Sequence, residues 1–237
     1  VPSGNNVILN NPGLILKVSP TAGDLLTQYA TTPGVITGKQ FNFDGQFTIN
    51  EDIEFINCTL WFTPGSQVVI NGPYNFIVNQ STLQASCDWW DGIVANDPQQ
   101  KVKVENGSYI KNAVVGIQIS NNALLEASDS YFEDNGQASI YFLNLSAPVY
   151  AGFVHHNQFS SASNLPAPYP KSQYGIIVGS ANHLEIGDYG NPTTPNTFTG
   201  MGSGIAVFQL QQSGSAQIAL YNNRFSDIHT TVPANFA

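Results

Sequence analysis

The chain has 237 residues, of which 42% are apolar and only 10% charged, enough apolar material for one continuous core. Seven basic and 16 acidic residues give a net charge of -9, which disfavours contact with nucleic acid and with anionic membrane surfaces. No apolar run reaches the roughly 18 to 20 residues that a membrane-spanning helix needs. We therefore predict neither nucleic-acid binding nor membrane insertion.

The first 45 residues are predicted to form a cap. Within them, residues 22–29 have the pattern of one short helix, whereas no helical periodicity interrupts the chain from Gln46 to Val232. An open end of a strand stack must be covered, which an N-terminal cap does. Because Met201 is the only methionine and the chain ends on a strand-like segment, we expect an excised part of a larger polypeptide, truncated at its C-terminal end.

From residue 46 onwards a three-residue motif repeats: a small polar residue or cysteine, a variable residue, then a large apolar one. The shortest spacing, 22 residues between Ile110 and Phe132, is close to one turn of a β-solenoid, and longer spacings indicate inserted loops. The seven apolar members are Leu60, Leu83, Ile110, Phe132, Phe159, Phe198 and Phe225.

A second column supports the same register. Alternating strands begin at Gly92-Ile93, Gly116-Ile117, Ser139-Ile140, Gly175-Ile176 and Gly204-Ile205. Equivalent positions of neighbouring rungs lie about 4.8 Å apart, so the apolar column would stack in the core and the Ser/Asn column would line an inner corner. We predict an all-β chain, a right-handed parallel β-helix of about seven rungs over residues 46–237. A β-sandwich is the alternative, although it does not need a Ser/Asn column at a fixed offset.

One block resembles a known family. Its residues are Phe55-Ile56-Asn57-Cys58-Thr59-Leu60, Pro64-Gly65, Val68-Val69-Ile70, Ser81-Thr82-Leu83, Cys87, Trp90 and Gly92-Ile93. The block is similar to the parallel β-helix regions, of the pectin-lyase-like superfamily, in large proteins that Bacteroidota export by type IX secretion. This resemblance covers roughly residues 40–232 and implies a secreted or cell-surface location, with a role in attachment or polysaccharide contact.

Two cysteines in an exported chain favour a disulfide between Cys58 and Cys87, which lie about one rung apart. The alternative is that Cys58 only fills the small inner column, leaving both thiols free and buried.

Two insertions are predicted to form a ligand surface at one corner. The first insertion contains Trp89 and Trp90. The second spans residues 161–174 and contains Tyr169 and Tyr174. Aromatic faces suit the C–H faces of pyranoses, so these four residues are candidate polysaccharide-binding side chains. The alternative is that one tryptophan belongs to the core and that the prolines stiffen the loop.

Catalysis would require carboxylates that converge on one bond. Asp88 and Asp91 flank the tryptophans and are the candidates for an acid pair or a calcium site, but the sequence indicates no other cofactor. His155 and His156 are expected to face opposite sides of a strand, and His183 and His229 have no evident partner, so no metal site is predicted. Lys111 and Glu133 are expected to form a surface ion pair.

The function predicted from these features is a non-catalytic β-helix module of a secreted or cell-surface protein, adhesin-like or a stalk, in contact with polysaccharide or other surface proteins. A carbohydrate-active enzyme, either a lyase or a hydrolase, is the alternative. A third possibility is a purely structural spacer.

Overall fold

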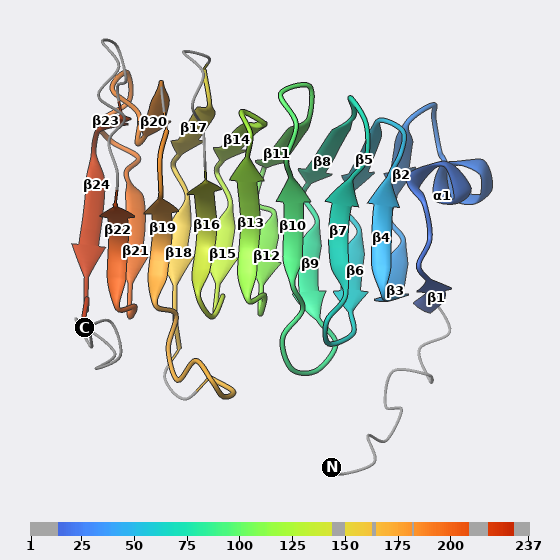
Figure 1. Ribbon diagram of the computed structural model, residues 1–237, viewed down its shortest axis with the longest axis horizontal. Helices are drawn as coiled ribbons and strands as arrows, with labels where there is room; N and C mark the ends of the chain where they lie inside the picture. Colours follow the sequence, from blue (N-terminus) through green and yellow to red (C-terminus); the bar gives the residue numbers. More distant parts are fainter. Residues whose placement is uncertain (1–13, 144–149, 163–164, 182, 209–217, 230–237) are drawn as a thin grey trace.

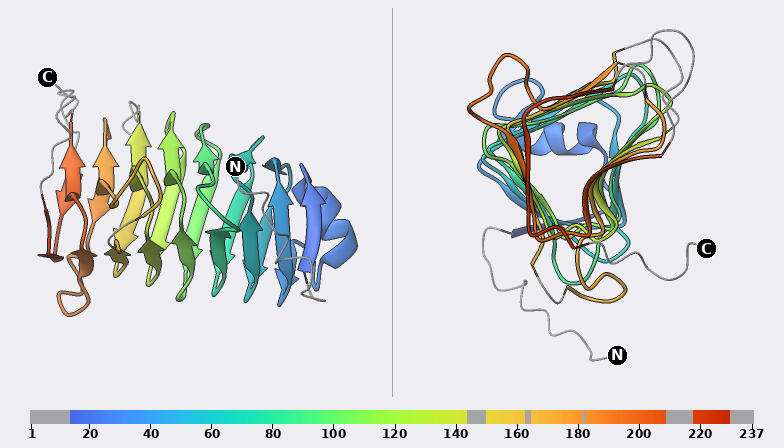
Figure 2. Two further views of the ribbon diagram at one scale, coloured as in Figure 1. Left: turned by 90° about the horizontal axis from the view of Figure 1, so that it is seen from below. Right: turned by 90° about the vertical axis from the view of Figure 1, so that its left-hand side faces the viewer.

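The computed structural model describes residues 14–143, 150–162, 165–181, 183–208 and 218–229. The described chain winds through three parallel sheets, here called A, B and C in the order in which each turn visits them (Figure 1). Figure 2 shows the sheets as the walls of one tube. This is the parallel β-helix that the sequence predicts, and from β3 to β23 it contains seven complete turns.

The three sheets have nine, seven and eight strands. Sheet A contains β1 (Leu14–Val18), β3 (Gln40–Asp44), β6 (Thr59–Phe62), β9 (Thr82–Ala85), β12 (Tyr109–Lys111), β15 (Tyr131–Glu133), β18 (Gln158–Ser160), β21 (Asn196–Thr199) and β24 (Asn223–Ser226). Sheet B contains β4 (Gln46–Ile49), β7 (Gln67–Ile70), β10 (Gly92–Ala95), β13 (Val115–Ser120), β16 (Ala138–Leu143), β19 (Tyr174–Val178) and β22 (Ser203–Val207). Sheet C contains β2 (Val35–Thr37), β5 (Ile53–Ile56), β8 (Asn75–Asn79), β11 (Lys101–Glu105), β14 (Leu124–Ser128), β17 (Gly152–His155), β20 (Leu184–Ile186) and β23 (Ile218–Leu220).

The predicted apolar column is confirmed as a single file in sheet A. Each of its seven residues pairs in register with the next, from Leu60 with Leu83 to Phe198 with Phe225. In the last four turns the rings stack with centroids 4.6 to 5.0 Å apart. Like residues thus lie over like residues, which gives the tube a continuous apolar interior.

The Ser/Asn column forms a buried hydrogen-bond ladder at the corner between sheets C and A. In four places a backbone N–H in one turn donates to the side chain of the column residue in the next turn. These bonds run from Cys58 to Ser81 (2.9 Å), Ser81 to Ser108 (3.2 Å), Ser130 to Asn157 (3.0 Å) and Asn157 to Asn196 (2.8 Å). At the sharp corner these backbone N–H groups have no partner within a sheet, and the side chains of the ladder accept their hydrogen bonds instead.

Glycines are required where sheet B turns away from sheet A. A Cβ on Gly175 would lie 2.6 Å from the Phe198 ring, and one on Gly204 would lie 2.3 Å from the Phe225 ring. At Gly175 and Gly204 the absence of a side chain therefore leaves the space that the aromatic rings of the file occupy.

The cap differs from the prediction in its extent. Helix α1 (Ala22–Tyr29) matches the predicted helix and lies across the N-terminal end of the tube (Figure 2), where Ala22 and Leu25 are fully buried. Strands β1, β2 and β3, however, already belong to the sheets, so stacking begins at Leu14 rather than at residue 46. In the first turn α1 occupies the place in the chain where later turns have a strand of sheet B.

Candidate functional site

The two tryptophans of the predicted ligand surface lie in the turn between β9 and β10, and they have different roles. Trp90 is fully buried, stacks on Phe62 with centroids 4.2 Å apart, and donates its indole N–H to the Lys111 carbonyl at 2.9 Å. The prediction that Trp90 joins a ligand surface is therefore wrong, because its ring fills the core. Trp89 points outward but is only 7% exposed.

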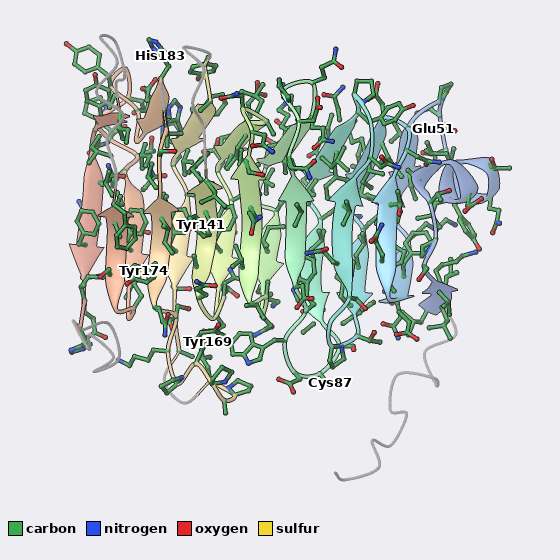
Figure 3. All side chains as sticks on the ribbon, viewed as in Figure 1. Glu51, Cys87, Tyr141, Tyr169, Tyr174 and His183 are labelled. Atoms are coloured by element: carbon green, nitrogen blue, oxygen red, sulfur yellow. The ribbon has the colours of Figure 1, made fainter. Side chains whose placement is uncertain are left out.

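Trp89 is covered by residues 165–170, which we call the strap. The strap belongs to the long turn between β18 and β19, and Figure 3 shows Tyr169 in that turn, below the sheets. The Trp89 indole N–H donates to the Ala167 carbonyl at 3.2 Å, and the edge of one ring meets the face of the other in the Trp89–Tyr169 pair, with centroids 5.7 Å apart. The structure thus brings Trp89 and Tyr169 together, as the sequence suggested, but in contact with each other.

Tyr174 belongs to a different aromatic group, on the outer face of sheet B. It lies at the start of β19, and its ring contacts that of Phe208 with centroids 6.2 Å apart. Tyr141 lies one strand away in β16 and on the same face (Figure 3), where it pairs in register with Ile177. Phe208 is 66% exposed, whereas Ile177 is only 4% exposed although it points outward. We call Tyr141, Tyr174, Ile177 and Phe208 the aromatic patch.

The patch continues into a file of uncharged residues that runs the length of sheet B. In register across the seven strands these residues are Thr48, Val69, Val94, Gln118, Tyr141, Ile177 and Ala206. None of the seven strands of sheet B contains Asp, Glu, Lys, Arg or His. Sheets A and C both carry charged residues, for example Lys111 and Glu133 in sheet A and Lys101 and Glu126 in sheet C.

At the other end of sheet B, a polar hollow of about 350 Å³ opens beside the file. It lies at the corner between sheets B and C, and amide side chains dominate its wall: Gln46, Asn71, Asn96, Gln99 and Gln100 line it together with the Gly72-Pro73 turn and Asp97. Gln100 is held rigidly, because its amide donates to the Ile70 carbonyl at 2.9 Å and accepts from the Asn96 N–H at 2.7 Å. Gln100 thus fixes part of the wall, while the other amide side chains of the hollow can bond a polar ligand.

The aspartates proposed as catalytic or calcium-binding residues are both exposed. Asp88 accepts a hydrogen bond from the Trp89 N–H at 3.0 Å, and the Asp91 N–H donates to the Ser66 carbonyl at 2.8 Å. Within the residues that the structure describes, no three His, Cys, Asp or Glu side chains are grouped so that they could hold a metal ion. These contacts give Asp88 a role in shaping the turn.

The predicted disulfide is wrong, since both cysteines are free. Cys58 is buried at the C–A corner in the ladder column, where its thiol accepts from the Lys39 N–H at 3.4 Å. Burial raises the pKa of the Cys58 thiol. Cys87 is exposed at the A–B corner, beyond the opposite end of the sheet A strands. The alternative is confirmed for Cys58, which fills the small inner column with a free, buried thiol, but it is wrong for Cys87, whose free thiol is exposed.

The histidine pair also differs from the prediction. His155 ends β17, and His156 has a φ of 58°, so the chain turns and the two rings lie 5.9 Å apart rather than on opposite faces. His156 Nε2 lies 3.1 Å from a carboxylate oxygen of Asp188, and its Nδ1 lies 3.4 Å from one of Asp129. His155 Nε2 lies 3.4 Å from Glu185, and burial lowers the pKa of His155 despite that carboxylate.

The remaining polar predictions have mixed outcomes. His229 does have a carboxylate neighbour, because its Nε2 contacts Asp227, which the sequence did not indicate. The predicted ion pair of Lys111 and Glu133 is confirmed, with 3.9 Å between nitrogen and oxygen. Apart from Tyr174, the aromatic patch is not evident from the sequence, because Tyr141 and Phe208 lie in or beside ordinary strands and outside the two insertions.

Comparison with known proteins agrees with this architecture. Residues 40–188, more than half of the chain, match the family described as "right handed beta helix region", and the chain therefore belongs to that family. The match confirms the predicted right-handed form. No curated protein matches the chain. In the described part of the chain, no helix has the length and apolar character needed to cross a membrane.

Proposed function

We propose that the chain is a non-catalytic β-helix module that holds a neutral polysaccharide along the outer face of sheet B. The observation that carries this proposal is the combination, on one sheet, of an aromatic patch and strands without a single charged residue. Aromatic rings stack on the apolar faces of pyranoses, while the amides and hydroxyls around them bond the sugar hydroxyls.

The dimensions of the face support an extended chain as the ligand. Neighbouring strands of a sheet lie about 4.8 Å apart, a distance comparable to the advance of one sugar in an extended polysaccharide. A sugar chain lying along the axis would therefore meet one uncharged side chain of the file at each turn. One end would contact Tyr141 and Tyr174, and the other would reach the amides of the polar hollow.

Charge favours a neutral polysaccharide over an anionic one. The net charge of -9 repels uronate polymers, and sheet B offers no cation to offset that repulsion. We also propose that the module works outside the cell, in a secreted or surface protein of the type IX secretion type, because extracellular polysaccharides are the polymers that such a face would meet.

Native gel electrophoresis through immobilised neutral polysaccharide tests the proposal. With hydroxyethylcellulose or xyloglucan in the gel, we expect the wild type to be retarded and Tyr141→Ala and Tyr174→Ala to run free. Tyr109→Ala is the matched control, because Tyr109 is a half-buried tyrosine stacked on Tyr131 in sheet A. Retardation should not change with salt, since no ion pair is involved. Two results would contradict the proposal. One is that polygalacturonate retards the wild type as strongly as the neutral polysaccharides do, and the other is that Tyr109→Ala and Tyr141→Ala are retarded equally.

A carbohydrate-active enzyme is the second candidate, favoured by one observation: His156 lies between the carboxylates of Asp129 and Asp188. An imidazole so placed can transfer protons. We expect no new reducing ends and no unsaturated products from any of these polysaccharides. Product formation that is lost in His156→Ala or Asp91→Ala would establish the enzyme instead.

A further inference from the structure

The strap covers Trp89 although Trp89 and Ala167 lie 78 residues apart in the sequence. To reach it, the strap crosses the two short turns between, which follow β12 and β15. We propose that the strap is a movable cover, and that its release exposes Trp89 and Tyr169 as a second pair of rings for a neutral sugar. This inference rests on the proposed function, because it extends the same ligand to the neighbouring corner.

The strap is built to move as one piece. Two backbone hydrogen bonds close it on itself: the Leu165 N–H donates to the Pro170 carbonyl at 3.1 Å, and the Tyr169 N–H donates to the Pro166 carbonyl at 3.1 Å. Its prolines hold the backbone in that shape. Release therefore does not require the strap to lose its own structure.

Few contacts hold the strap closed. Among the described residues, one hydrogen bond joins it to another turn, from the Trp89 indole N–H to the Ala167 carbonyl. The Tyr169 ring contacts Trp89 and also packs against Gly136. A Cβ on residue 136 would have no room beside that ring. Pro166, Ala167, Pro168 and Pro170 are all exposed. A cover whose contacts within the described chain are one ring, one hydrogen bond and the packing of Pro166 can exchange with an open state.

The groups under the strap suit a sugar. They surround a cavity of about 160 Å³, lined by Ala85, Cys87, Asp88, Trp89, Asn112 and, from the strap, Pro166. With the strap open, the indole face would stand beside the Asp88 carboxylate and the Asn112 amide. The indole face can stack on the C–H face of a pyranose. The carboxylate and the amide can form hydrogen bonds with its hydroxyls.

The second surface adjoins the first. The strap is followed directly by the segment that leads into Tyr174 of the aromatic patch. That segment is anchored at both sides, because the Gln173 N–H donates to the Gly136 carbonyl and the Ser203 N–H donates to the Gln173 carbonyl, each at 2.8 Å. The patch would therefore stay in place while the strap moves.

Two variants shift the strap in opposite directions. In Gly136→Ala the new methyl group would lie 2.3 Å from Cδ2 of Tyr169, so the ring must move and the strap should open. Pro166→Cys places a thiol on the lining of the same cavity as the native Cys87, so a disulfide formed on oxidation should lock the strap closed. Cys58 is buried and does not compete for this bond. Tyr169→Ala opens the strap by a second route, through loss of the ring.

Acrylamide quenching of tryptophan fluorescence measures strap opening without any ligand. All variants carry Trp61→Phe, and because Trp90 is fully buried, the quenched signal then belongs to Trp89. We expect a several-fold larger quenching constant in Gly136→Ala, and the smallest constant in oxidised Pro166→Cys, restored by reduction. Equal constants in the open, locked and parent chains would overturn the movable strap.

Cellohexaose then tests the second surface. We expect it to protect Trp89 from quenching in Gly136→Ala and to have no such effect in oxidised Pro166→Cys. If the strap opens and cellohexaose leaves Trp89 unprotected, while Tyr141→Ala still abolishes retention in the gel, the second surface is refuted and the proposed function stands. Loss of retention for every neutral polysaccharide refutes the proposed function, whatever the quenching shows.

Discussion

Replacing Asn157 by alanine is the sharpest test of the ladder at the C–A corner. The Asn157 side chain accepts from the Ser130 N–H at 3.0 Å and donates to the Ala127 carbonyl at 2.9 Å, and it is fully buried. Alanine removes both bonds. A buried N–H left without a partner costs about 1 to 3 kcal/mol, and the second bond contributes about 1 kcal/mol. We therefore expect the free energy of unfolding to fall by about 2 to 4 kcal/mol.

Urea denaturation followed by far-ultraviolet circular dichroism measures this loss. Gln158→Ala is the control, because Gln158 is the next residue and is exposed, so its replacement should change stability by less than about 0.5 kcal/mol. Asn157→Ser should lose less than Asn157→Ala, since Ser108 fills the same column two turns earlier. Equal free energies of unfolding for Asn157→Ala and Gln158→Ala would show that the ladder does not stabilise the fold.

Three further outcomes are expected. A thiol-reactive dye should label one cysteine of the native chain, Cys87, and also Cys58 after denaturation; no label in the denatured, unreduced chain would indicate a disulfide. Burial holds the folded-state pKa of His155 below that of the unfolded chain, so the unfolded chain binds more protons between the two values. The free energy of unfolding should therefore fall as the pH drops below about 6.5, and fall less in His155→Gln, as pH-dependent urea titrations would show. Gly175→Ala should lose about 1 to 3 kcal/mol in the same assay because its Cβ would meet Phe198, and an unchanged midpoint would contradict that packing.

The fold could be predicted because its signal is repeated. Phe132, Phe159 and Phe198 recur at one offset from a small polar residue, and only a stack of turns places such residues in register. The first turns lack this signature, since Phe41 follows Lys39 and Gln40 rather than a Ser/Asn position.

The site was predicted less well, because its residues lie at corners between sheets. There the local backbone angles, rather than strand alternation, decide where each side chain points. Cys58 and Cys87 are separated by about one turn, but they lie at different corners, and spacing alone does not reveal this. His156 faces the same side as His155 because of one left-handed backbone angle. Trp89 and Trp90 have no periodic neighbours that would distinguish the outward ring from the core ring.

Helix α1 also limits how copies of this molecule can join. A fibre that grows end to end needs each copy to add through one end and to be added to through the other. At the N-terminal end α1 buries Ala22 and Leu25 over the first turn and packs against β4, the edge strand of sheet B, whereas the edge strands of sheets A and C at this end are β1 and β2. In the described chain the last strands at the opposite end are β22, β23 and β24, one in each sheet, so only two of the three sheets present a strand edge without a covering helix at both ends. One eight-residue helix thus interrupts sheet B at the N-terminal end and disfavours a filament in which all three sheets continue from one copy to the next.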